Sequence, residues 1–178
     1  GAYNIGIGES TLGALTTGAN NTAVGATALD AATTGNDNVA IGKNALGSNT
    51  TASNTTAMGS HALGSQTTPG GNTAVGYYAG FDVTTGDSNS FFGYEAGDQI
   101  TTGTSNVAMG HRSMGTLTTG SSNTVVGQNA NTSASGASSQ IVLGQGVTGN
   151  ANSSFCFGTG SSDSAIANGA TSISAPSD

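Results

Sequence analysis

The chain has almost no positive charge. Lys43 and Arg112 are its only cations against nine acidic residues, which gives a formal net charge of −7. Two cations neutralise few phosphates, so nucleic acid and anionic membrane surfaces are poor partners. No apolar run approaches the roughly 18 residues of a membrane span, and no signal peptide opens the chain. We therefore expect no nucleic-acid binding and no membrane insertion.

Cysteine, tryptophan and large aliphatic residues are also scarce. Cys156 is the single cysteine, which excludes an internal disulfide and offers no metal-site spacing. Leu, Ile, Val and Phe make up 28 of 178 residues, below the roughly 20% level at which chains tend towards disorder. Disorder also needs high charge, however, and this chain has little. What remains is a polymer rich in Gly, Ala, Ser, Thr and Asn, which is neither a conventional globular core nor a polyelectrolyte.

A strict repeat organises these small residues. A glycine that closes an "AVG"-like triplet recurs every 17 residues, without one insertion. These anchor glycines are Gly8, Gly25, Gly42, Gly59, Gly76, Gly93, Gly110, Gly127 and Gly144. A period this short suits one coil of a β-solenoid and is too short for a pair of helices. Positions in each coil are counted below from its anchor glycine.

The residues before the anchor predict a strand with two different faces. Position −3 is often β-branched, position −2 is mostly alanine, and position −1 is apolar in every coil. We expect the −1 row to fill the inside of the coil and the alanine row to face outward. The −1 row is Ile7, Val24, Ile41, Met58, Val75, Phe92, Met109, Val126 and Leu143, and the alanines are Ala23, Ala40, Ala57, Ala74 and Ala108.

The rest of each coil predicts turns and a second inward row. Position +4 is mostly leucine, and "TTG" or a variant closes most coils. Position −4 is Asn in seven coils, and stacked Asn side chains can hydrogen-bond from one coil to the next. We expect positive φ or close backbone approach at the anchor glycine. Each coil should then hold two short strands and two turns.

These patterns predict an all-β fold, a parallel β-solenoid (β-roll) with 17-residue coils. Residues 1–148 would form nine coils, and residues 149–178 an irregular last coil and an extended C-terminal segment. Each coil has about two large inward side chains, whereas ordering 17 residues costs on the order of 20 kcal/mol. We therefore expect a homo-oligomer, most simply a homotrimer packed through the alanine row. A monomeric solenoid with an alanine-rich solvent face is the alternative.

The repeat "NTAVG..AL…TTG..NVAIG..AL" resembles the head repeats of trimeric autotransporter adhesins, and resembles even more the repeat arrays of phage tail fibres. The resemblance covers residues 1 to about 148. It implies a left-handed, trimeric, parallel β-roll on a virion or a cell surface. The left hand is an exception to the usual crossover rule and follows only from the resemblance.

The ending "ISAPSD" resembles the junction at which endosialidase-type tailspikes meet their self-cleaving intramolecular chaperone. In that family the chaperone is cut off between a Ser and an Asp. The matching positions are Ser177 and Asp178, which the resemblance makes a possible cleavage junction.

No cluster of catalytic residues stands out in the sequence. His61 and His111 belong to coils three apart and to different positions of the repeat, so they should not share a metal or a triad. No metal-protease, P-loop, nucleophile-elbow or calcium β-roll motif is present. We expect no enzyme activity, no metal and no cofactor.

One region is rich in aromatic residues: six of the nine lie between 77 and 94. Position +1 holds Tyr or His in three successive coils, so these rings should stack. Aromatic rings beside carboxylates commonly hold sugars, which predicts a glycan-binding surface. The candidate residues are Tyr77, Tyr78, Tyr94, His111, Asp82 and Asp87. In the alternative, Phe91 and Phe92 fill a wider place in the bundle core and the tyrosines cover a surface or line a subunit seam.

Two further pairings follow from the repeat. Glu95 and Arg112 share position +2 in adjacent coils and should form an inter-coil ion pair. The Thr pairs form seven consecutive ranks, which suggests an ice-binding surface, but adjacent strand residues point to opposite sides, so only one rank would face outward. The alternative is a turn ladder of hydroxyl groups that bond to the backbone.

The sequence therefore indicates a structural or adhesive fibre segment. The leading expectation is an extracellular phage tail fibre that takes part in host attachment, with a glycan or a protein as receptor. The alternatives are a trimeric autotransporter adhesin head on a bacterial surface and a monomeric ice-binding solenoid.

Overall fold

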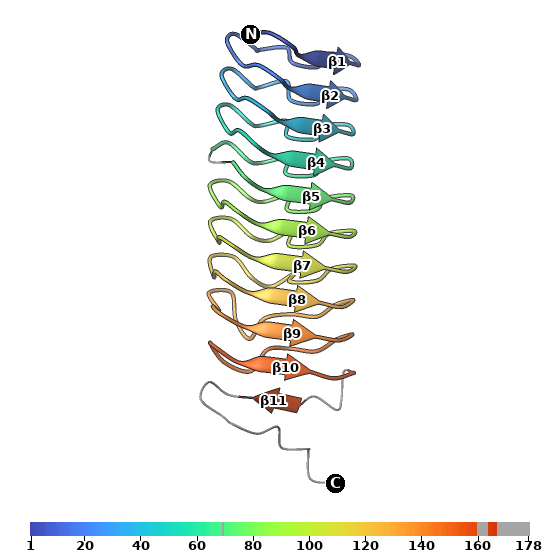
Figure 1. Ribbon diagram of the computed structural model, residues 1–178. Helices are drawn as coiled ribbons and strands as arrows, with labels where there is room; N and C mark the ends of the chain where they lie inside the picture. The colour runs from blue at the N-terminus through green and yellow to red at the C-terminus, as the bar shows by residue number, and fades with distance from the viewer. Residues whose placement is uncertain (69, 160–163, 167–178) are drawn as a thin grey trace.

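A computed structural model describes residues 1–68, 70–159 and 164–166, the last three by their backbone alone. The chain winds into a β-solenoid in which each coil places one strand in a single sheet (Figure 1). The described residues contain no helix. The strands are β1 (Ile5–Ile7), β2 (Thr22–Val24), β3 (Val39–Ile41), β4 (Thr56–Met58), β5 (Thr73–Val75), β6 (Ser90–Phe92), β7 (Val107–Met109), β8 (Thr124–Val126), β9 (Ile141–Leu143), β10 (Phe155–Phe157) and β11 (Ser164–Ile166).

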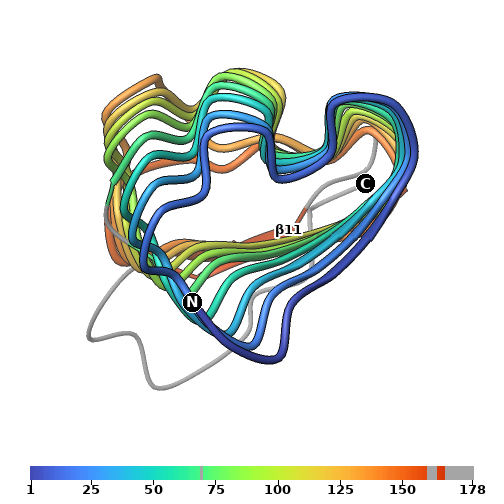
Figure 2. The same cartoon turned by 90° about the horizontal axis from the view of Figure 1, so that it is seen from above.

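The strands pair in chain order, and the register repeats the sequence period. From β1 to β9 each residue lies beside the residue 17 positions further on, as Val24 lies beside Ile41. Strand β10 pairs in parallel with β9 after only 14 residues, because Phe155 lies beside Ile141. Strand β11 pairs antiparallel with β10 and thus ends the parallel run. The prediction that positions one period apart lie over one another is confirmed (Figure 2).

Each coil holds one strand of three residues, so the expectation of two strands per coil was wrong. The half of the coil that follows the anchor alternates between left-handed and right-handed backbone. Thr27 and Leu29, at positions +2 and +4 of their coil, have φ angles of 55° and 52°. A chain that changes hand at every second residue cannot extend, and therefore this half forms turns.

The expected orientation of the strand was also wrong. The alanine row at position −2 is buried, with Ala40 and Ala57 fully inaccessible. The −1 row lies on the outside, where Ile41, Met58 and Met109 keep 36%, 40% and 43% of their surface exposed. Val24, Ile41 and Val75 do form one row, but it is an outer row.

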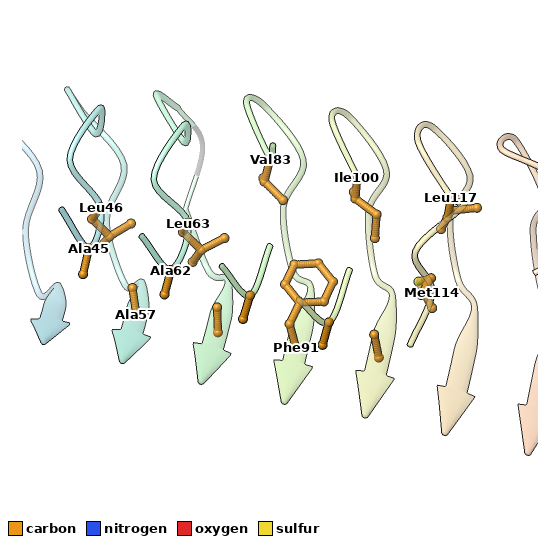
Figure 3. Packing of buried hydrophobic residues seen from close by; sticks show 14 of the residues in the cluster. Ala45, Leu46, Ala57, Ala62, Leu63, Val83, Phe91, Ile100, Met114 and Leu117 are labelled. Atoms are coloured by element: carbon orange, nitrogen blue, oxygen red, sulfur yellow. The ribbon is translucent and has the colours of Figure 1, made fainter. Parts of the chain in front are cut away.

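The interior is too narrow for large residues from both sides, which explains the orientation. Leu46 and Leu63 at position +4 reach across the coil and leave room for only a methyl group at position −2 of the strand, as in Ala57 (Figure 3). The strand therefore turns its small residue inward and its large residues outward. The interior is one cluster of buried apolar side chains that runs along the rod.

The buried Asn side chains form a ladder along the rod, as predicted. Asn38 donates from its side-chain nitrogen to Asn21 Oδ1 at 3.0 Å and to the carbonyl of Ala52 at 2.9 Å. Its backbone nitrogen donates to the same Asn21 oxygen. Each amide thus satisfies a neighbouring coil and closes a turn of its own coil, which stabilises buried polar groups that would otherwise cost free energy.

The anchor glycines confirm both reasons expected for them. Gly25 has a φ of +128°, and a Cβ added to it would lie 2.6 Å from the carbonyl carbon of Gly42 in the next coil. A side chain at this position would therefore push two coils apart. The chain can stack closely along this corner because only hydrogen atoms stand between the two backbones.

Two predicted features need a separate statement. Ser177 and Asp178, the possible chaperone junction, lie outside the residues that the structure describes. Across those described residues, none forms a helix with the length and apolar character needed to cross a membrane.

Candidate ligand-binding surface

The aromatic ladder consists of Tyr77, Tyr94 and His111, which stand at position +1 of three successive coils. The rings of Tyr77 and Tyr94 have centroids 5.2 Å apart and lie within 18° of parallel. Those of Tyr94 and His111 are 5.1 Å apart at 13°. The predicted stacking is therefore confirmed. Tyr77 and Tyr94 keep 44% and 42% of their surface exposed, so the ladder lies on the outside of the rod.

A second group of rings, which the sequence reading did not connect with the first, lies beside the ladder. His61 stacks on Tyr78 with centroids 4.8 Å apart and an angle of 24°, and Phe81 lies 4.6 Å from Tyr78. Tyr78 in turn contacts Tyr77 at 4.5 Å. The signal was available, because His61 and Tyr78 share position +2 in adjacent coils. The two groups make one aromatic surface across four coils.

Stacking changes what the ladder can bind. Each ring inside it is covered on its flat sides by the rings above and below, so a sugar cannot lie against the flat side of Tyr94. The ring edges and the two ends of the ladder remain accessible. A ligand that uses ring stacking must therefore bind at an end.

A charged pair flanks the ladder, as predicted. Arg112 Nε donates to Glu95 Oε2 at 2.6 Å, with side-chain exposures of 57% and 20%. The bond to Arg112 lowers the pKa of Glu95, and the hydrogen bond that the Tyr94 phenol donates to Glu95 raises the pKa of Tyr94. The pKa of Tyr77 is raised as well, first by partial desolvation and then by Tyr78. The carboxylate beside the ladder is thus already occupied by Arg112 and Tyr94.

The two aspartates predicted for the site lie in other turns. Asp87 precedes strand β6, whereas Tyr94 follows it, so the strand separates them. The backbone nitrogen of Asp82 donates to the carbonyl of Asp98, and the charge of Asp82 helps to raise the pKa of Asp98. Glu95, rather than either aspartate, is the acid that contacts the ladder.

The two phenylalanines of β6 point to opposite sides. Phe91 is fully buried in the solenoid interior, whereas Phe92 keeps 40% of its surface exposed in the outer −1 row. The prediction that both fill the core holds only for Phe91.

The Thr pairs form the predicted ladder of hydroxyl groups. The first Thr of each pair bonds to the next coil, as when Thr33 Oγ1 donates to the carbonyl of Thr50 at 3.0 Å. The second Thr is exposed in every pair, which leaves one outward rank: Thr17, Thr34, Thr51, Thr68, Thr85, Thr102 and Thr119.

The described surface has no enclosed pocket. Within the same residues, no three His, Cys, Asp or Glu side chains come together as metal ligands would. Comparison with known proteins finds no matching protein-family model, no similar curated protein and no similar solved structure. The geometry and the residue chemistry are therefore the basis for assigning a function.

Proposed function

We propose that this chain is a segment of a homotrimeric fibre, most simply a phage tail fibre that serves in host attachment, with the left-handed winding that the family resemblance implies. The observation that carries the proposal is the outer strand face, which comprises positions −3 and −1 of strands β1–β10. Ile41, Phe92 and Met109 expose 36%, 40% and 43% of their surface there. Rows of exposed apolar side chains on a protein commonly mark an interaction surface.

The charge distribution favours another copy of the chain as the partner for this face. No strand from β1 to β10 contains a charged residue, so the outer strand face is uncharged over its whole length. A chain with a net charge of −7 repels its own copies except where its acids are absent. Association through the outer strand face keeps the acids apart and covers the apolar row.

This surface replaces the alanine row as the proposed contact between copies. The alanines are buried inside the coil and unavailable to a partner, whereas the larger −1 side chains are available. A bacterial adhesin head would use the same face, and differs from a tail fibre in what the complete protein carries. The exposed Thr rank is the observation that favours the other candidate, a monomeric ice-binding solenoid.

Mass in solution tests the assembly. We expect sedimentation equilibrium to give about 51 kDa, the mass of three chains of 17.0 kDa. Met58→Glu and Met109→Glu each place a charge on the outer strand face and should shift the mass towards one chain. Thr85→Glu, on the exposed Thr rank, is the matched control and should leave the trimer intact. A wild-type mass of 17.0 kDa together with thermal hysteresis would overturn the fibre and favour ice binding.

A further inference from the structure

The aromatic ladder has an open end at Ser60. Position +1 holds Lys43, Ser60 and Tyr77 in three successive coils, and backbone hydrogen bonds keep these coils in register. The carbonyl of Lys43 accepts from the nitrogen of His61 at 2.9 Å, and that of Ser60 accepts from Tyr78 at 3.1 Å. The short side chain of Ser60 cannot cover the ring of Tyr77 as Tyr94 covers its other side. One flat side of Tyr77 therefore borders a ledge the height of one coil.

The ledge has polar groups along one side. The ring of His61 lies over Tyr78, at position +2, rather than over Tyr77. Its Nδ1 shares a hydrogen bond of 2.9 Å with Ser60 Oγ, which fixes the imidazole and the hydroxyl beside the ledge. An exposed aromatic surface next to a fixed hydroxyl and imidazole suits a ligand that has an apolar ring side and hydroxyl groups at its edge.

A cation stands on the far side of the ledge. Lys43 is exposed, and its backbone lies two coils from Tyr77, about 10 Å at the usual spacing of strands. Its flexible four-carbon stem can bring the ammonium group over Ser60. The ion pair recorded among the described residues joins the other cation, Arg112, to Glu95. Lys43 therefore remains available for an anionic ligand.

We propose that Lys43, Ser60, His61 and Tyr77 form a binding site for a sugar that carries a carboxylate, such as a sialic or a uronic acid. The sugar ring stacks on Tyr77 in the place that a further ladder ring would occupy. Lys43 binds the carboxylate, and Ser60 and His61 bond to the hydroxyl groups. This inference rests on the proposed role in host attachment and names the class of receptor.

The site is shallow and exposed, so we expect weak binding by one chain. Three copies in one fibre would strengthen attachment to a surface that displays many such sugars, because the second and third contacts form within the same complex. Salt should weaken binding, since Lys43 is exposed to screening.

Saturation-transfer NMR on the intact protein tests the site with sialyllactose, a glucuronate-terminated disaccharide and lactose as the neutral control. We expect saturation of at least one acidic sugar and several-fold less of lactose; the comparison of the two acidic sugars distinguishes the sources. Equal saturation of lactose, or none of any sugar, would overturn the proposal. Because the mass is measured separately, a trimer without sugar binding overturns this inference and leaves the fibre standing.

Two variants locate the sugar on the ledge. Ser60→Tyr completes the ladder and should abolish saturation by filling the place of the sugar. The fold should accept this change, because Tyr77 and Tyr94 occupy the same position in the next coils, and circular dichroism checks it. Lys43→Gln should reduce saturation by the acidic sugar to the level of lactose, whereas Arg112→Gln, which removes the other cation, should not. Undiminished binding by Ser60→Tyr would show that the ledge is not the site.

Discussion

Phe91 illustrates how single residues adjust to one another in the narrow interior. It stands where most coils have alanine, and the two positions against which its ring packs are Gly80 and Gly97, where other coils have leucine. A Cβ at Gly80 would lie 2.6 Å from the Phe91 ring, and one at Gly97 would lie 2.5 Å from it. The chain has moved its bulk from the turn to the strand and kept the interior filled (Figure 3).

This exchange predicts strong coupling between Phe91 and Gly80. Phe91→Ala should destabilise the protein by about 3–5 kcal/mol, because it leaves a cavity. Adding Gly80→Leu should recover much of the loss, since Leu63 has a similar backbone, with φ angles of 48° at Leu63 and 61° at Gly80. Gly80→Leu alone should destabilise by overpacking. Urea unfolding of the four proteins measures the coupling, and additive effects would contradict the exchange.

Asp98 predicts a dependence of stability on pH. Partial burial raises its pKa, and the charges of Glu95 and Asp82 raise it further. A carboxyl with a raised pKa in the folded state is more costly to ionise there, so the folded protein loses stability as pH rises from the unfolded pKa, about 3.9, through the folded one. Asp98→Asn should therefore raise the melting temperature at pH 7.

The gain should shrink on acidification and vanish below about pH 3.9, where the unfolded carboxyl is protonated too. Asp37→Asn, at an exposed acid outside this cluster, controls for the loss of one negative charge. A gain from Asp98→Asn that persisted unchanged at pH 3 would refute the electrostatic explanation.

At the scale of the element, the Asn ladder has one gap that a different element repairs. Thr55 takes the place of Asn in the fourth coil, and Gln66 reaches it from a turn. Gln66 Nε2 donates to Thr55 Oγ1 at 3.2 Å, and Asn72 Nδ2 donates to Gln66 Oε1 at 3.0 Å. The amide of Gln66 thus restores the line of buried hydrogen bonds between Asn38 and Asn72.

Gln66→Leu should destabilise the protein by about 1–3 kcal/mol, because it leaves buried polar groups without partners. Leucine itself should fit, since Leu15 and Leu117 occupy the same position in other coils. Adding Thr55→Asn should restore stability by completing the ladder. Thermal unfolding measures both variants. A double variant no more stable than Gln66→Leu would contradict the proposed repair.

The spacing of the glycines was sufficient to predict the coil, its register and the stacked side chains, because a strict period places like residues over one another. Which side of the strand faces inward could not be predicted in the same way. Ala57 and Met58 alternate equally well in either orientation, and the choice depends on how far Leu63 reaches across the coil. The open end at Ser60 was missed for a related reason, since it requires knowing that the rings of Tyr77 and Tyr94 cover each other.

For the molecule as a whole, the constant coil makes length a variable that can change only in whole steps. Deleting residues 26–42, one period of 17, should leave the remaining coils in register. Deleting residues 26–41 removes 16 and turns every later side chain to the wrong side at the junction. We expect the first variant to unfold cooperatively with a modest loss of stability and the second to aggregate. Circular dichroism and light scattering distinguish them; equal behaviour would contradict the stacking.

The Asn ladder also makes the rod polar. Every amide in it donates towards the start of the chain and accepts from the coil that follows, as Asn38 does with Asn21. A coil presented upside down would bring donor against donor and lose these bonds. Two such rods therefore cannot join top to top by continuing their ladders, and the stack has a beginning and an end in the way that an arrow has.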